Sequence, residues 1–253
     1  MEAQFSQRSL AFERISACDG ATLTEDEIQA IKQNCLSGLD CTPNELACTI
    51  SHRTCWRLVA DGDDDHVCIF EDGVHLSSDA GNLLSKASWI PKDADLIKLE
   101  TFNVEAEFYH KRPIKAQDRT LYPVRGMHQG AAGYIISRTA ARRLLDKTRN
   151  DYGGVSYLLF GPTAAKRADL HTYQLYPALC IQNMRLSGDK IPRLANLLGH
   201  ERLAHIEQGT QALAAQAKTL SRGVWSQMSR NMKEQARRLF VEPYHSEIVP
   251  FQQ

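Results

Sequence analysis

The strongest constraint on the fold is a helix with a clear start, followed almost at once by an apolar strand. Thr42-Pro43-Asn44-Glu45 matches a capping box with proline at the first helical position. It predicts a helix from about Pro43 to Ala60, which ends at Asp61-Gly62. His66–Phe70 then has the pattern of a short buried strand, and Glu71-Asp72 follows its carboxyl end. Ligands bind at this end of the strands in open α/β sheets, so the acidic pair is the first candidate for chemistry.

Further strands and helices alternate along the chain. We expect strands at Asp95–Glu100 and about Ala131–Ile136, then a helix capped by Ser137 that runs to Lys147. Such alternation predicts an α/β fold with a mixed, mainly parallel sheet flanked by helices. From about Asp189 the apolar residues recur at helical spacing. We therefore expect an α/β domain over residues 1–188 and an α-helical C-terminal extension over residues 189–253. Residues 103–128 match no recognised motif and are expected to form a loop, either a surface for an anionic acceptor or, as the favoured interpretation, a solvated loop.

Composition narrows the function classes. The 253 residues include 30 Lys plus Arg and 30 Asp plus Glu, so no net field draws in nucleic acid, and we expect no nucleic-acid partner. No stretch reaches the ~20 apolar residues of a membrane span, nor does the start have a signal-peptide core, so we predict a cytoplasmic protein. Basic residues outnumber acidic ones between Lys190 and Arg238. This excess indicates peripheral contact with anionic membrane at its inner face, or else a solvated helix face.

The seven cysteines do not suggest a metal centre. They form no C-x-x-C pair, and an odd number cannot close completely into disulfides. Buried, reduced thiols are the favoured interpretation. Cys48 and Cys55 lie seven residues apart on the expected helix, which favours a packing role for both.

The acidic pair suits a particular reaction. Transfer from a nucleotide sugar needs oxygen ligands that hold a divalent cation against the leaving diphosphate, and Glu71 and Asp72 could supply them. The alternative is an ordinary turn, since aspartate often begins one.

Five segments in order resemble one family. They are FERISACDG at residues 12–20, LDCTPNELACTISHRTCW at 39–56, VCIFEDGVHL at 67–76, LIKLE at 96–100 and GAAGYIISRTAARRLL at 130–145. Together they resemble glycosyltransferase family 25, the lipooligosaccharide and collagen galactosyltransferase type. The resemblance implies a GT-A type fold, a UDP-sugar donor, a divalent cation (Mn²⁺ or Mg²⁺) and inversion at the anomeric carbon. It also implies transfer of a hexose, galactose from UDP-galactose, to a glycan or glycolipid acceptor such as lipooligosaccharide or LPS.

The resemblance also assigns residues. Glu71 and Asp72 match the acidic motif at the metal and the diphosphate, with Asp72 as metal ligand. The expected donor-binding residues are Ser51, His52, Lys98, Gly130 and Tyr134. Three of these donor-binding residues also have a structural alternative. His52 could be an internal hydrogen-bonding residue, Lys98 could lie on an edge strand with its amine in water, and Tyr134 could lie in the core.

Three departures touch the reaction centre. Gly73 stands where the family usually has a second aspartate, which removes one expected metal ligand. Ser156 stands where the family tends to place an aspartate, and Asp151 is the nearest carboxylate that could act as base instead. Met1–Phe5 resembles the end of the family's first helix, so we expect the strand before it to be missing and a sheet edge to be exposed. These departures leave open a catalytically degenerate member that acts as a glycan-binding or partner-binding module.

Overall fold

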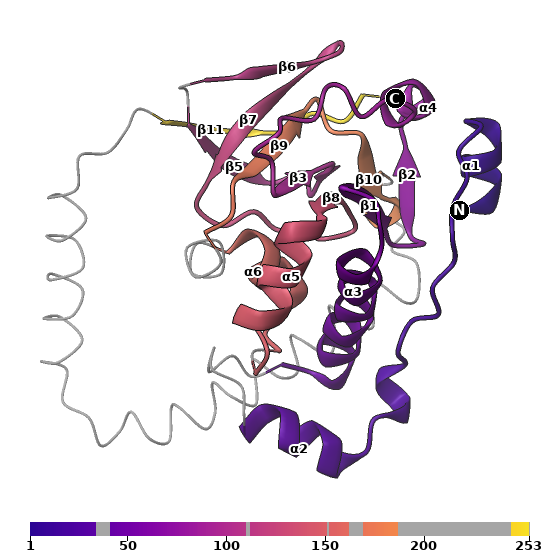
Figure 1. Ribbon diagram of the computed structural model, residues 1–253, viewed down its shortest axis with the longest axis vertical. Coiled ribbons are helices and arrows are strands. Elements are labelled where there is room, and N and C mark those ends of the chain that lie inside the picture. The colour runs from indigo at the N-terminus through magenta and orange to yellow at the C-terminus, as the bar shows by residue number, and fades with distance from the viewer. Residues whose placement is uncertain (34–40, 110–111, 151, 162–168, 187–243, 253) are drawn as a thin grey trace, which may run out of the picture. The chain divides into compact units, whose positions relative to one another are not determined.

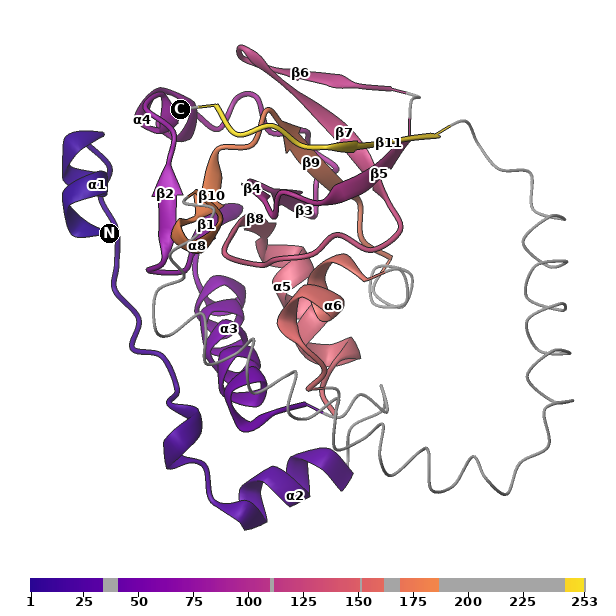
Figure 2. The same ribbon diagram turned by 180° about the vertical axis from the view of Figure 1, so that it is seen from behind.

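The computed structural model describes residues 1–33, 41–109, 112–150, 152–161, 169–186 and 244–252, seen from two sides in Figures 1 and 2. All of them belong to one unit, Met1–Pro192 with Tyr244–Gln253. Within this range no helix is long and apolar enough to cross a membrane.

A central sheet organises the fold. Its strands lie in the order β1-β8-β3-β9-β7-β5-β11, and β6 pairs with β7. A second, three-stranded sheet has the order β2-β10-β4. The central strands are β1 (His66–Phe70), β3 (Leu96–Lys98), β5 (Glu105–Tyr109), β6 (Ile114–Ala116), β7 (Arg119–Arg125), β8 (Gly133–Ser137), β9 (Thr172–Tyr176) and β11 (Tyr244–Ile248). The second sheet consists of β2 (Val74–Leu76), β4 (Glu100–Thr101) and β10 (Cys180–Gln182).

The predicted α/β class with a mixed sheet is confirmed, but the expectation of a mainly parallel sheet is wrong. Among the described strands, parallel pairing occurs only between β3 and β9 and between β4 and β10. A parallel pair needs a long crossover, usually a helix. Between β4 and β8 the chain instead forms β5, β6 and β7, and β8 then runs antiparallel to both β1 and β3. The arrangement is consistent with a GT-A-like fold.

Three helices cover one face of the central sheet: α3 (Pro43–Asp61), α5 (Arg138–Lys147) and α6 (Val155–Phe160). The start of α3 has the predicted capping box, because Thr42 Oγ1 accepts from Glu45 N and the Glu45 carboxylate accepts from Thr42 N. Ser137 caps α5 by accepting from Ala140 N at 3.0 Å. Apolar side chains from all three helices and from β1, β3 and β8 form one core, in which Trp56 is fully buried.

The opposite face is covered by a second core. It joins the second sheet to α1 (Glu2–Gln7) and α4 (Ala80–Leu84). Arg8 ties the N-terminal segment to this region, since its guanidinium donates to Leu76 O and Ser77 O, both at 2.7 Å. The other helices in the described part of the chain are η1 (Gly20–Thr22), α2 (Glu25–Gln33) and α8 (Asn183–Leu186).

Two predictions from the sequence are wrong because strands form where none was predicted. The segment 103–128 forms β5, β6 and β7, with Phe108 and Leu121 fully buried, so the prediction of a solvated loop is wrong. The range 189–253, expected to be helical, contains β11, which pairs antiparallel with β5. The rest of that helical prediction, and the basic residues from Lys190 to Arg238, fall on 187–243, outside the described residues.

β1 lies at the end of the central sheet, where β8 is its one partner among the described strands. The strand's position matters for function because its carboxyl end carries the acidic pair.

Candidate active site

The acidic turn that follows β1 is held at both ends by backbone hydrogen bonds. Glu71 N donates to Ala132 O at 2.9 Å, and Asn183 N donates to Gly73 O at 2.8 Å. Between these two anchors the side chain of Asp72 is exposed. The turn therefore has a fixed backbone and presents an unshielded carboxylate to solvent.

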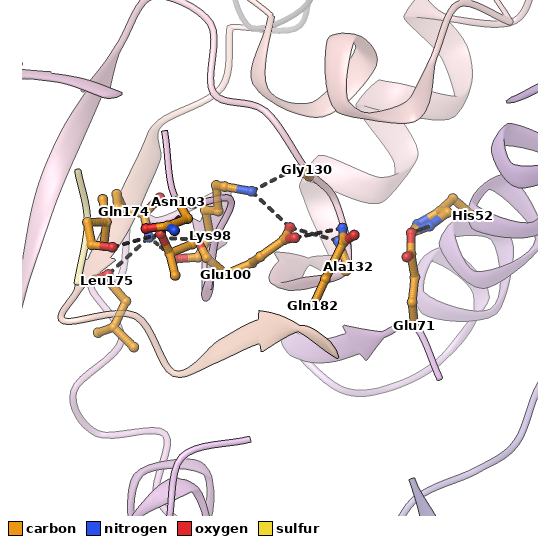
Figure 3. A network of polar contacts seen from close by, with 12 residues as sticks. His52, Glu71, Lys98, Glu100, Asn103, Gly130, Ala132, Gln174, Leu175 and Gln182 are labelled. Atoms are coloured by element: carbon orange, nitrogen blue, oxygen red, sulfur yellow. Dashed lines mark hydrogen bonds and ion pairs between the residues drawn. The ribbon is translucent and has the colours of Figure 1, made fainter. Parts of the chain in front are cut away.

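Glu71 points toward the buried His52 of α3, as Figure 3 shows. His52 Nε2 lies 3.4 Å from Glu71 Oε1. The side chain of Glu71 is 38% exposed, whereas that of His52 is 6% exposed. The carboxylate is thus oriented from inside by the imidazole and still reaches solvent on its other side.

The tautomer of His52 can be assigned from its other partners. Tyr134 Oη accepts from Trp56 Nε1 at 2.8 Å, and indole is a donor only. Burial raises the pKa of Tyr134 well above its usual value, so the hydroxyl keeps its proton. That proton points to His52 Nδ1 at 2.9 Å, which must therefore accept. We assign the remaining ring proton to Nε2, from which it is donated to Glu71.

Cys48 completes a cluster with His52 and Glu71, whose ligand atoms lie within 4.8 Å of one another. Such a trio could hold a borderline-soft metal only through a thiolate and a free imidazole lone pair. Burial, together with the charges of Glu71 and Glu45, raises the pKa of Cys48. The assigned tautomer places a proton, not a lone pair, on Nε2. The cluster therefore serves to orient Glu71, in keeping with the packing role expected for Cys48.

The acidic turn itself fits a hard divalent cation. Glu71 and Asp72 offer carboxylate oxygens, and one or two carboxylates plus substrate phosphates are a common ligand set for Mg²⁺. At Gly73, an added Cβ would meet no heavy atom within 4 Å. The space next to the turn could therefore hold the further carboxylate that Gly73 does not supply.

Lys98 lies in neither of the two places expected for it. It is on β3, an interior strand, and is 2% exposed. Its Nζ donates to Gly130 O at 2.6 Å and to Glu100 Oε2 at 3.1 Å. β3 is not an edge strand because β8 and β9 pair with it on either side, and the amine is kept from water by Gly130, Glu100 and the Phe160 ring, whose centroid lies 4.8 Å from Nζ.

Gly130 is needed for the same internal contact. Its φ is +85°, and a Cβ at this position would lie 2.5 Å from Glu100 Oε2. Its carbonyl is occupied by Lys98. The structure thus gives Gly130 a role in packing around Glu100, while a contact between Gly130 and the donor stays a prediction.

Ser51 and Tyr134 also have structural roles inside the protein. Ser51 Oγ donates to Ala47 O at 2.8 Å and accepts from Cys18 N at 2.9 Å, which ties the Cys18 segment to α3. Tyr134 is fully buried, in agreement with the alternative core role. Of the five expected donor-binding residues, His52 alone touches the acidic turn through its side chain.

The proposed base lies outside the described residues, since Asp151 is not among them. Ser156 lies on α6, one residue after its first. Sequence reasoning missed Trp56 and Glu100, although both have a signal: Trp56 follows His52 at helical spacing, and Glu100 lies within the LIKLE segment.

Two cavities among the described residues lie away from the acidic turn. One of about 960 Å³ opens at the other end of β1, where its lining includes His66, Asp95 and Arg143. A second, of about 210 Å³, lies between Tyr109 and Thr172. Neither is lined by Glu71 or Asp72, so the site is defined by the acidic turn and its hydrogen bonds.

The comparisons with known proteins agree with this arrangement. The model of glycosyltransferase family 25 (LPS biosynthesis protein) matches residues 1–155, more than half of the chain, and the chain belongs to this family of glycosyltransferase enzymes. The lipooligosaccharide biosynthesis protein lic2B of Haemophilus influenzae is 26% identical over 260 aligned positions, covering 99% of this chain and 93% of the relative.

Two further relatives have related names. The lacto-N-neotetraose biosynthesis glycosyltransferase LgtB of Neisseria meningitidis serogroup B is 26% identical over 247 positions, which cover 92% of this chain and 88% of LgtB. A protein of Haemophilus influenzae named as a glycosyltransferase is 29% identical over 194 positions, covering 74% of this chain and 66% of the relative. The protein is thus a glycosyltransferase of the type found in lipooligosaccharide biosynthesis.

Proposed function

We propose that this protein transfers a hexose, galactose from UDP-galactose, to a lipooligosaccharide or LPS acceptor with inversion at the anomeric carbon. The observation that carries the proposal is the fixed acidic turn, in which Glu71 is oriented by His52 and Asp72 is exposed. The names of the relatives support the acceptor class. A nucleotide-sugar donor follows from the family.

Asp72 and Glu71 would hold the divalent cation, Mn²⁺ or Mg²⁺. When bound, the cation neutralises charge that develops on the diphosphate as the sugar leaves. His52 keeps the Glu71 carboxylate in one orientation through its Nε2–H, so little reorganisation is needed when the donor binds. Asp151 is the carboxylate we propose as general base, which takes the proton from the acceptor hydroxyl as its oxygen attacks the anomeric carbon.

The test is a transfer assay with Mn²⁺, UDP-galactose and a lactose-terminated acceptor, read by UDP release and by the anomeric configuration of the product. Asp72→Ala should abolish both turnover and metal-dependent UDP binding. Asp118→Ala removes another exposed aspartate, in the β6–β7 turn, and should change neither. Metal-dependent UDP binding without turnover on any UDP-sugar would instead favour the degenerate, glycan-binding alternative.

A substitution at Gly73 tests whether an added carboxylate strengthens metal binding. Gly73→Asp would add a carboxylate into open space, without a positive φ to penalise it. We expect tighter Mn²⁺ binding, by about tenfold, which is the effect of ~1.4 kcal/mol. Gly154→Asp is the matched control, because an added Cβ there also meets nothing within 4 Å. An unchanged Mn²⁺ affinity in Gly73→Asp would place the cation elsewhere.

We also propose that the enzyme works in the cytoplasm, in peripheral contact with anionic membrane through the basic residues between Lys190 and Arg238. Sedimentation with anionic vesicles that falls with added salt is the expected result. Equal sedimentation with neutral vesicles would contradict it.

A further inference from the structure

Glu100 is a charged residue without any solvent exposure, and it lies behind the acidic turn. Its carboxylate accepts three hydrogen bonds: from Lys98 Nζ at 3.1 Å, Ala132 N at 2.9 Å and Gln182 Nε2 at 2.8 Å. Figure 3 shows this network, with Glu100 between Lys98 on one side and Ala132 and Gln182 on the other. All three partners are donors, so the geometry fits an ionised carboxylate.

Two of these partners lead directly to the acidic turn. Ala132, whose N–H is held by Glu100, accepts from Glu71 N through its carbonyl. Gln182, held through its side chain, directly precedes Asn183, whose N–H is donated to Gly73 O. The Glu71 end of the turn is therefore connected to the Glu100 carboxylate through Ala132, and the Gly73 end through Asn183 and Gln182.

From this juxtaposition we propose that Glu100 is a positioning residue for the transfer reaction, which fixes the backbone of Glu71–Gly73 through Ala132 and Gln182. The inference rests on the proposed function in that Glu71 and Asp72 act at the nucleotide diphosphate. Glu100 itself touches no substrate. Its contribution is to prevent the turn from shifting when charge develops beside it, since small displacements of positioned groups reduce catalysis sharply.

Two details show that the surroundings are adapted to this carboxylate. Lys98 supplies the counter-charge and would itself be costly to bury without Glu100. Gly130, at φ +85°, leaves the space that Glu100 Oε2 occupies. A carboxylate needed only to fill volume would require neither.

The test compares two double variants that both lack the buried charges. Lys98→Met with Glu100→Gln keeps an acceptor for Ala132 N, and the Gln182 amide can turn to suit it. Lys98→Met with Glu100→Met has similar volume but no such acceptor. Amide hydrogen exchange at Glu71 and Asn183 should be about tenfold faster in the methionine pair than in the glutamine pair, as the loss of one hydrogen bond implies. Amides of β5 and β7 should exchange alike in both.

Steady-state kinetics supply the second readout. We expect kcat to fall about tenfold in the methionine pair relative to the glutamine pair, while KM for UDP-galactose changes less than about twofold. Gly130→Ala, which displaces the carboxylate without removing charge, should give the same exchange pattern. Asp79→Asn breaks another ion pair, with the buried Arg119, and should lower stability without changing Glu71 exchange or kcat.

Equal exchange at Glu71 in the two double variants would overturn the inference, as would acceleration spread evenly over the sheet. If both double variants fail to fold, Gln182→Leu at the half-buried end of the network decides the question, with faster exchange at Asn183 as the required result. A wild type that transfers no sugar would refute the proposed function. The exchange comparison would then still decide whether Glu100 fixes the turn.

Discussion

Two pairs of a carboxylate and a nitrogen base lie close together in this enzyme, and they differ in what surrounds them. In the Lys98–Glu100 pair both side chains are at most 2% exposed. In the His52–Glu71 pair the base is buried, but the carboxylate is 38% exposed. Three donors hold the two carboxylate oxygens of Glu100, whereas the carboxylate of Glu71 is held by the side chain of His52 and remains open to solvent.

The difference teaches which pair is able to act on a ligand. A carboxylate whose two oxygens both accept from neighbouring donors, and which has no solvent contact, can only hold its neighbours. One that is oriented on one side and open on the other can bind a cation or a phosphate-bound metal. The following predictions test this division, beginning with the largest expected effect.

Glu71→Gln should reduce kcat by about 10²–10³, the usual cost of removing one preorganised electrostatic group. Stability should change little because the side chain is partly exposed and its shape is kept. Initial rates of UDP release and urea unfolding measure the two effects. Glu105→Gln, at an exposed position on β5, is the control and should retain full activity. A Glu71→Gln enzyme as active as the wild type would refute a role for this carboxylate.

Lys98→Met should destabilise the fold by about 3–5 kcal/mol, because it leaves Glu100 as a buried charge without its partner. The double variant Lys98→Met, Glu100→Gln should recover most of this loss, since neither charge remains. Urea unfolding of the two variants provides the measurement. A single variant as stable as the double one would mean that Glu100 is not ionised in the folded protein.

Tyr134→Phe should cost about 1–3 kcal/mol, as it leaves Trp56 Nε1–H without its acceptor in the core. It should also free His52 Nδ1, so that ¹⁵N NMR detects a population with the proton on that nitrogen. Tyr157→Phe, at a half-buried position on α6, is the control and should alter neither observable. If ¹⁵N NMR of the wild type placed the proton on His52 Nδ1, the assigned direction of this chain would be incorrect.

The smallest expected effect is the pH dependence of folding stability that arises from Glu100. Burial raises the pKa of Glu100 above 4.5, Lys98 opposes this shift and the charge of Glu71 adds to it. The folded protein therefore holds this proton more tightly than the unfolded chain does. The contribution of protonated Glu100 to stability is fully present below the pKa that Glu100 has in the unfolded chain. It is lost as pH rises through the pKa of Glu100 in the folded protein, by about 1.4 kcal/mol for each unit of the shift.

Unfolding free energies of the wild type and of Lys98→Met, Glu100→Gln between about pH 4 and pH 8 isolate this contribution. The wild type should lose stability relative to the double variant as pH rises. A difference that grows in the opposite direction would mean that the pKa of Glu100 is lowered on folding.

Local features were readable from the sequence. The capping box at Thr42 and the cap at Ser137 need only residues within one turn, and both helices begin where predicted. Strand β1 matched its predicted bounds, His66–Phe70, because its apolar run is short and bounded. The family motifs, taken together in their order along the chain, predicted the class of enzyme, even though each motif alone was a weak signal.

Long-range neighbours were not readable. The environment of Lys98 depends on which strands lie beside β3. One of them, β9, begins at Thr172, which pairs with Leu96 at a separation of 76 residues. The partners of His52 are Tyr134, 82 residues away, and Glu71, 19 residues away. β5 and β7 were not predicted because charged residues such as Glu105, Glu107 and Arg125 interrupt their apolar pattern.

Residues 244–252 have a consequence for biosynthesis. β11 pairs with β5, Thr101 Oγ1 donates to Val249 O at 2.7 Å, and Ala178 N donates to Pro250 O at 2.8 Å. A nascent chain that has not yet reached Tyr244 leaves the β5 edge without this partner. The sheet can therefore close only after residues 244–250 have left the ribosome, and a chain that stops before Tyr244 should be removed by quality-control proteases.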